Sequence, residues 1–261
     1  MENDDGPVGQ ILSRRDALKL LGITSAAFLA GCVPGTSDVL TDTPVPTSIL
    51  EATSTPLASG KGATAIPACV VRPEVTEGPY YVDEDLDRSD VRSDPATGEV
   101  KEGALLALTF NVSQVASGGC APLEGAKVEI WHCDAEGVYS DVADPGFNTQ
   151  GQKFLRGYQV TDGNGQATFL TIYPGWYSGR TVHIHFKVHQ DTAGQGREFT
   201  SQLFFDDAFT DQVFSQEPYA SKGQRNTLNS NDNIYQDELL LAVGQTSDGY
   251  ASTFDIGLQL D

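Results

Sequence analysis

Apolar and polar residues alternate in short runs through the second half of the chain, which is the two-residue period of a β-strand. Gly, Asn and Asp residues separate the runs, for example at residues 161–165, and supply the positive φ angles that tight turns need. Only residues 207–220 and 233–243 have room for a helical turn or two. The predicted strands are residues 105–115, 126–132, 157–160, 166–172, 181–189, 198–205 and 252–260.

About seven short strands spaced in this way favour an all-β fold, an antiparallel β-sandwich with long loops. The chain has 261 residues, which is enough for one well-packed core with additional segments. The strand pattern is confined to residues 68–261, so we expect the folded domain there. No internal repeat is present.

Residues 1–32 are typical of an export signal. Residues 13–19 contain the pair Arg14 and Arg15 and resemble a twin-arginine motif, and the apolar run that follows is too short to span a bilayer. The run ends in Leu-Ala-Gly-Cys, which resembles a bacterial lipobox and makes Cys32 the predicted lipidation site. We therefore expect export by a bacterial cell and a lipid anchor at the outer face of a membrane, in the periplasm or outside the cell. The alternative is an ordinary amphipathic helix.

Residues 33–67 are rich in Thr, Ser, Pro and Ala and nearly lack aromatic side chains. Such a composition cannot bury enough apolar area to order a chain, so we predict a disordered tether. A flexible chain of this length spans roughly 30 to 35 Å, enough to hold a domain clear of a membrane surface.

The charge balance limits the class of partner. Asp and Glu number 36 against 16 Lys and Arg, a net charge of -20 that would repel a phosphate backbone and disfavours nucleic-acid binding. We expect membrane contact through the lipid anchor only. A homo-oligomer remains open.

The segment 173–186 carries the residues best suited to chemistry. In a strand, His183 and His185 share one face, while Ile184 and its neighbours pack on the other. Two neutral imidazoles aimed at one volume indicate a metal site. If the phenols of Tyr177 and Tyr139 reach the same point, the ligand set favours ferric iron, because zinc more often takes Cys, a carboxylate or a third His. Tyr173 competes with Tyr177 for this role.

Several segments in order resemble the intradiol ring-cleavage dioxygenases, most closely the secreted, single-domain branch akin to protocatechuate 3,4-dioxygenase subunits. The resemblance covers roughly residues 69–260 and implies one non-haem Fe(III) per chain, held by two tyrosines, two histidines and a solvent hydroxide. It also implies cleavage of catechol-type aromatics by O2 to cis,cis-muconate-type diacids. The matching segments are residues 76–80, 131–141, 154–157, 174–177, 180–186 and 200–205.

Matching the family motifs position by position implies the ligands. The Gly-x-Tyr and Pro-Gly-x-Tyr motifs fall on Tyr139 and Tyr177, which also favours Tyr177 over Tyr173. Tyr177 and His183 would be axial, and Tyr139 and His185 equatorial. The departing Tyr177 would accept a proton from the substrate.

The resemblance also implies residues around the substrate. Arg180 would stabilise negative charge on the substrate ring, and Gln202 would lie nearby, although a surface salt bridge is the plainer reading of Arg180. The loop of residues 76–80 would line the substrate side, or would be only a turn with an aromatic plug. Its candidate contacts are Gly78, Pro79 and Tyr80.

The link between Tyr177 and Arg180 is short, only Ser178 and Gly179, which predicts an open pocket and tolerance of varied catechols such as catechol, protocatechuate and lignin-like fragments. His132 is expected to be structural. His189 lies about 13 Å along the strand from His185, too far to be a ligand. Two other functions compete: a non-enzymatic β-sandwich lipoprotein that binds aromatic or carbohydrate ligands, and a zinc or copper hydrolase that uses His-x-His.

The cysteines complete the predictions. With Cys32 lipidated, three remain, which allows one disulfide and one free thiol. Cys120 and Cys133 bracket a strand of about 20 Å, much longer than the roughly 6 Å of a disulfide. Cys69 is therefore the expected partner of one of them. We favour Cys69 with Cys133, because each precedes a segment assigned to the site.

Overall fold

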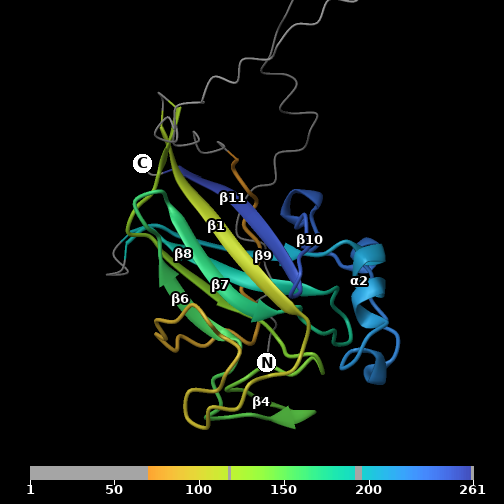
Figure 1. Ribbon diagram of the computed structural model, residues 1–261. Coiled ribbons are helices and arrows are strands. Elements are labelled where there is room, and N and C mark those ends of the chain that lie inside the picture. The colour runs from red at the N-terminus through yellow and green to blue at the C-terminus, as the bar shows by residue number, and fades with distance from the viewer. Residues whose placement is uncertain (1–69, 117–118, 192–195, 260–261) are drawn as a thin grey trace, which may run out of the picture. The chain divides into compact units, whose positions relative to one another are not determined.

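The computed structural model describes residues 70–116, 119–191 and 196–259. The predicted export signal, the predicted tether, Cys32 and Cys69 lie outside these residues. Within them the chain forms two main sheets, as the sequence pattern predicted, with a small two-stranded ribbon and short helices (Figure 1).

The first sheet is built around the long strand β1, which pairs with β11 on one edge and with β7 and β2 on the other. The short strand β10 extends the sheet beyond β11. The bounds are β1 Leu105–Ala116, β2 Gly119–Pro122, β7 Gln166–Ile172, β10 Gly244–Gln245 and β11 Tyr250–Gln259.

The second sheet has the order β6-β3-β8-β9, and every neighbouring pair is antiparallel. A separate ribbon pairs β4 with β5. The bounds are β3 Lys127–Trp131, β4 Ala143–Asp144, β5 Phe147–Asn148, β6 Arg156–Val160, β8 His183–His189 and β9 Glu198–Phe204.

One pairing differs from the expected antiparallel arrangement. Strands β1 and β11 run parallel, with Leu106 opposite Tyr250 and Val115 opposite Gln259, and they lie side by side in Figure 1. Parallel neighbours require a long crossover connection, and the alternation of residues within a strand carries no information about its neighbour's direction. The remaining predicted strands are present with their ends shifted by at most two residues.

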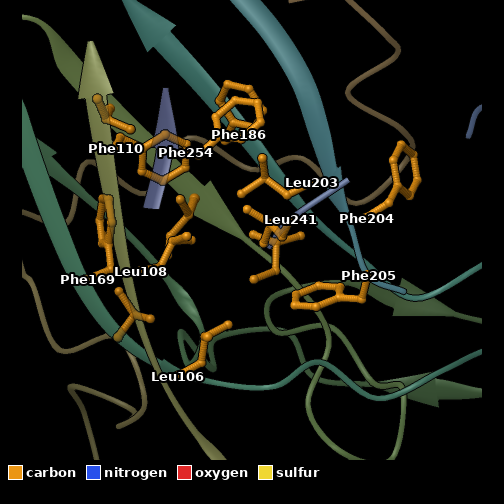
Figure 2. Close-up of a cluster of buried hydrophobic side chains, with 14 of the residues drawn as sticks. Leu106, Leu108, Phe110, Phe169, Phe186, Leu203, Phe204, Phe205, Leu241 and Phe254 are labelled. Carbon is orange, nitrogen blue, oxygen red and sulfur yellow. The ribbon is translucent and has the colours of Figure 1, made fainter. Parts of the chain in front are cut away.

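The core lies between the inner faces of the two sheets. Phe110 of β1 contacts Phe186 of β8 and Phe254 of β11, with ring centroids 5.2 and 6.1 Å apart (Figure 2). On β8, Ile184 and Phe186 are completely buried in this core. Burying one such side chain stabilises the fold by about 1.5 to 3 kcal/mol. The inward residues of β8 therefore determine that its alternate residues, the histidines, face the other way.

A short helical region follows β9, largely where the pattern left room for it. Helix α2, Asp207–Phe214, begins at Asp206, whose side chain accepts a hydrogen bond from the Phe209 amide. Three 3-10 turns come after it: η1 Ala220–Lys222, η2 Asn229–Asn231 and η3 Asp237–Leu239. None of the described helices is long and apolar enough to cross a bilayer.

The predicted pairing of Cys69 with Cys133 is wrong. Cys133 has a free, buried thiol at the end of β3, where its Sγ donates to the Gly175 carbonyl oxygen at 3.6 Å. Cys120, on the edge strand β2, is disulfide-bonded instead. The prediction failed because the strand carries Cys133 into the interior between two loops, and burial of this kind is not visible in cysteine spacing.

Candidate metal centre

The two predicted histidine ligands project from the outer face of the second sheet. His183 and His185 are each 1% exposed, and their Nε2 atoms are 3.0 Å apart. Trp131, opposite His185 on β3, stacks on the His185 ring with a centroid distance of 5.0 Å and an interplanar angle of 8°. The alternation of β8 thus brings both imidazoles to one point, as the sequence predicted.

The backbone determines the tautomer of His183. Its Nδ1 lies 2.6 Å from the carbonyl oxygen of Thr181, which can only accept, so Nδ1 carries the proton and Nε2 presents a lone pair. Burial, reinforced by the nearby Arg180, lowers the pKa of His183 to about 3. Burial likewise holds the pKa of His185 well below its usual value. Both rings are therefore neutral near pH 7, the form that binds metals.

Both predicted tyrosines reach the same point. The hydroxyl oxygens of Tyr139 and Tyr177 lie 3.3 and 3.1 Å from His183 Nε2. Their rings meet edge to face at 5.7 Å. Four potential ligand atoms, two nitrogen and two oxygen, thus converge around one volume from three separate segments of the chain.

Burial also raises the pKa of both phenols above the usual value of 10. Burial disfavours the loss of the phenol protons. A hard, highly charged cation would therefore be needed to bind both oxygens as phenolates. Among the described residues, no group of three or more His, Cys, Asp or Glu side chains could hold a metal. The tyrosine oxygens are the further donors beside the two imidazoles, and two phenolates with two imidazoles form a donor set that suits ferric iron.

Two glycines let the tyrosine-bearing loops meet. Gly137 has φ +77°, and a Cβ there would lie 2.1 Å from the carbonyl oxygen of Trp176. A Cβ on Gly175 would lie 2.3 Å from the carbonyl oxygen of Ala135, and the Gly175 amide donates to the carbonyl oxygen of Asp134. Only glycine permits these approaches. The Gly-x-Tyr and Pro-Gly-x-Tyr motifs are therefore the points where each loop supports the other.

The predicted substrate-side loop lies against this centre. A Cβ on Gly78 would be 3.2 Å from Cε1 of His185, and Tyr80 stacks on Tyr139 with a centroid distance of 4.6 Å. The Tyr80 hydroxyl donates to Asp144 of β4 at 2.9 Å. Burial, followed by this hydrogen bond, raises the pKa of Tyr80 to about 12. Tyr80 is thus a wall of the site, and Pro79 joins it to Gly78.

Arg180 and Gln202 are also adjacent, because Arg180 Nη2 donates to the side-chain oxygen of Gln202. Gln202 lies opposite His185 on β9 and donates through Nε2 to the Thr76 carbonyl oxygen at 2.8 Å. The alternative prediction for Arg180 was a surface salt bridge. Arg180 does form a salt bridge, but its partner is the buried carboxylate of Asp232 at 2.9 Å. The pair belongs to the site's surroundings and not to the open surface.

Three further residues lie where the sequence placed them, outside the ligand set. His132 is buried between the Cys133 carbonyl oxygen and the Thr171 hydroxyl, so it is structural. Tyr173 bonds to Thr210 of α2 at 2.7 Å and does not reach the centre. His189 lies beside the carboxylates of Glu129 and Glu198.

Sequence reasoning missed several residues around the site. Arg156 is buried and holds the Ser140 and Tyr80 carbonyl oxygens, each at 2.7 Å. Trp131, Asp144 and Asp232 were missed as well. No spacing signal could have found Asp232, because it follows Arg180 by 52 residues and meets it only in the fold.

Known proteins resemble this chain in sequence and in fold. Residues 76–259 match the family model described as Dioxygenase. An intradiol ring-cleavage dioxygenase from Tetranychus urticae is 32% identical, with a TM-score of 0.63, over 74% of this chain and 95% of that one. The dioxygenase domain of a carbohydrate-binding fusion protein from Streptomyces sp. SirexAA-E is 28% identical, with a TM-score of 0.53, over 74% of this chain and all of that one.

Among curated proteins, the protocatechuate 3,4-dioxygenase beta chain of Burkholderia cepacia is 32% identical over 136 residues, which is 49% of this chain and 56% of that protein. The chain spans about half the length of the curated relatives it matches. The family match nevertheless covers most of the chain and every segment that builds the centre. The chain belongs to the intradiol ring-cleavage dioxygenase family.

Proposed function

We propose that the protein is a non-haem Fe(III)-dependent intradiol dioxygenase that cleaves catechol-type aromatics with O2 to cis,cis-muconate-type diacids. One observation carries the proposal: the His185 nitrogen and the two tyrosine oxygens lie 3.0 to 3.3 Å from Nε2 of His183. Family membership supports the reaction class.

The proposed ligands of one iron per chain are Tyr139, Tyr177, His183 and His185. When bound, ferric iron supplies a Lewis acid that holds the two substrate oxygens and makes the aromatic ring reactive towards O2. Two phenolates would offset most of the ferric charge, and their hard oxygens favour iron in its oxidised form.

The two tyrosines have different surroundings, which suggests different roles. Tyr139 is 1% exposed and is covered by Tyr80, so it serves as a fixed ligand. Tyr177 is only partly buried and precedes the exposed residues Ser178 and Gly179. As the less buried of the two, it is the proposed proton acceptor, whose Oη would take one proton from a catechol hydroxyl.

The remaining residues bind and orient the substrate. The Arg180 guanidinium would stabilise negative charge that develops on the substrate ring. Gln202 holds that guanidinium on one side and the loop of residues 76–80 on the other. Trp131 and Tyr80, packed on His185 and Tyr139, would exclude water from the ligand atoms.

Colour and oxygen uptake test the proposal together. Phenolate bound to ferric iron should make the protein red to burgundy, and the coloured protein should consume O2 with catechol while muconate absorbance appears. A colourless, iron-free preparation that stays inactive after ferric loading would refute the proposal. Binding of catechol without oxygen uptake would favour the non-enzymatic lipoprotein instead.

The substrate range is a second part of the proposal. We propose that catechol, protocatechuate and lignin-like fragments are all accepted, because Ser178 and Gly179 are exposed and the link they form is short. A kinetic panel measures kcat/KM for each. One efficient substrate among otherwise inert ones would contradict a broad range.

The cellular location is also proposed, on the sequence of residues 1–67. We propose twin-arginine export, lipid attachment at Cys32 and a tether that holds the domain clear of the membrane. A C32S variant should move from the membrane fraction to the soluble fraction and lose the lipid mass at its N-terminus. Equal membrane association of both proteins would contradict the anchor.

A further inference from the structure

Asp232 has a buried carboxylate that three N–H donors surround. Its Oδ2 accepts from Arg180 Nε and from the Thr181 amide, each at 2.9 Å, and its Oδ1 accepts from the Ile234 amide at 2.8 Å. The side chain is only 2% exposed. A buried carboxylate of this kind is stable only while its partners satisfy it.

Two of these partners lead directly to the centre. Arg180 continues through its Nη2 to Gln202, and Gln202 holds the Thr76 carbonyl oxygen at the start of the substrate-side loop. Thr181 continues through its own carbonyl oxygen to Nδ1 of His183, at 2.6 Å. One carboxylate therefore holds both the guanidinium and the peptide that orients a ligand histidine.

We propose that Asp232 is a positioning residue of the ring-cleavage site, which aims the Arg180 guanidinium at the substrate and holds the Thr181 peptide that orients His183. The inference rests on the proposed function, since it assigns Arg180 a role towards the substrate. Asp232 touches no ligand atom and acts through these two neighbours. Two of the three guanidinium nitrogens of Arg180 are held by Asp232 and Gln202, while Nη1 has no hydrogen bond within the described residues and is left to meet a ligand.

The donor pattern explains why a carboxylate is needed. All three groups that face Asp232 donate, and a carboxylate accepts on both oxygens. In Asp232→Asn one oxygen becomes an NH2 group, which would face a donor whichever way the amide turns. The nearly isosteric change therefore breaks the alignment while it leaves the side-chain volume in place.

The test is a double-mutant cycle on the iron-loaded full chain, with oxygen uptake on catechol. D232N should lower kcat/KM by roughly 10- to 100-fold, as loss of a group that supports a metal-site residue does. R180A should lose at least as much. If Asp232 acts through Arg180, adding D232N to R180A should cost only about threefold more, because coupled residues are not additive. Fully multiplicative losses would overturn the proposal.

A second readout does not depend on turnover. Anaerobic titration with catechol, followed by the change in the charge-transfer band, measures binding to the ferric protein. D232N should keep a tyrosinate band and weaken catechol binding by roughly tenfold, as a misaligned guanidinium would. Wild-type catechol affinity together with wild-type kcat/KM would overturn the proposal.

Asp94→Asn is the matched control. Asp94 is 5% exposed and also accepts three backbone N–H groups, from Ala96, Thr97 and Lys153 at 2.8, 3.2 and 2.7 Å. It contacts none of the site residues. D94N should lower the melting temperature but keep kcat/KM within about twofold of wild type, since it makes the same chemical change elsewhere. Equal losses of kcat/KM in D94N and D232N would overturn a specific role for Asp232.

If D232N does not fold, D232E replaces it. Glu keeps both acceptor oxygens and moves them by one methylene, so the displaced guanidinium should cost up to roughly 100-fold in kcat/KM. A loss below twofold would overturn the proposal. A wild-type protein without colour or oxygen uptake would overturn the proposed function and this inference with it, whereas an active wild type with an unaffected D232N overturns only the inference.

Discussion

At the scale of single residues, burial determines the chemistry of the centre. It keeps both imidazoles neutral and raises the pKa of both phenols, so the four side chains present lone pairs and hydroxyl groups without net charge. A cation with high charge is the natural complement of such a set. The motif match favoured Tyr177 over Tyr173, and the fold places the Tyr177 hydroxyl at 3.1 Å from His183 Nε2 and the Tyr173 hydroxyl at 2.7 Å from that of Thr210.

The tyrosine assignment predicts a sharp contrast between two identical substitutions. Tyr139→Phe removes a proposed ligand oxygen and should abolish both the charge-transfer colour and ring cleavage, and His185→Ala should do the same. Tyr173→Phe removes a hydroxyl whose hydrogen-bond partner is Thr210 of α2, so it should keep both and cost about 1 kcal/mol of stability. Visible spectra measure the charge-transfer colour of each variant, and oxygen uptake measures its ring cleavage. Full activity in Tyr139→Phe would refute the ligand assignment.

Cys133 gives a prediction of its own. Burial, followed by the nearby Asp134, raises the pKa of this thiol to about 12, whereas an unfolded cysteine ionises near 8.5. The thiol should therefore resist alkylation at pH 8 until the protein is denatured, as mass mapping of the labelled peptide would show. The stability that comes from the neutral thiol is fully present below about pH 8.5 and is lost as the pH rises towards 12. Rapid labelling of the native protein would contradict a buried thiol.

At the scale of elements, the site is assembled from strand alternation and from two interlocked loops. Strand β8 supplies the histidines, and the loops after β3 and β7 supply the tyrosines. Gly137 and Gly175 bring these loops into contact, since any side chain there would meet backbone atoms of the other loop. The separation of the two phenols therefore depends on loop packing as much as on sheet register.

Two glycine substitutions separate close approach from backbone strain. Gly137 and Gly151 both have positive φ, +77° and +85°, but a Cβ on Gly151 would have nothing within 4 Å. Gly151→Ala should cost about 1 kcal/mol from its backbone alone, and the iron centre should be intact. Gly137→Ala should cost several kcal/mol more and should lower iron content, because Trp176 and the adjacent Tyr177 must move. Chemical denaturation and metal analysis measure both. Equal effects would show that the loops do not support each other.

At the scale of the whole domain, one sheet separates the apolar core from the chemistry. The inner face of the second sheet packs against β1 and β11, and its outer face carries the two histidines proposed as ligands. Stability and reactivity therefore reside on opposite faces of the same strands, which allows the core to be weakened without direct contact with the ligands.

Phe110→Ala tests this separation. Phe110 is completely buried against Phe169, Phe186 and Phe254, so its removal should lower the free energy of unfolding by about 3 to 5 kcal/mol. The fraction that stays folded should keep its colour and its kcat/KM. Val100→Ala, at a position 53% exposed, should change stability little. Loss of colour in folded Phe110→Ala would show that the two faces are coupled.

The sequence by itself determined the features that depend on local periodicity and motif. Alternation along β8 placed His183 and His185 on one face, and the turn residues marked the strand ends. These two features could be read because each follows from the geometry of a few consecutive residues. The choice of Tyr139 and Tyr177 came instead from the resemblance of the two glycine-tyrosine motifs to those of the family.

Only the tertiary structure decided what depends on contacts between distant segments. It paired β11 in parallel with β1, left Cys133 as the free thiol and placed Asp232 against Arg180. The spacing of residues along the sequence predicts none of these contacts. The segments approach each other through crossovers and loops, and the packing of the core determines the course of these connections. The candidate ligands could be predicted from the chain, whereas their alignment required the fold.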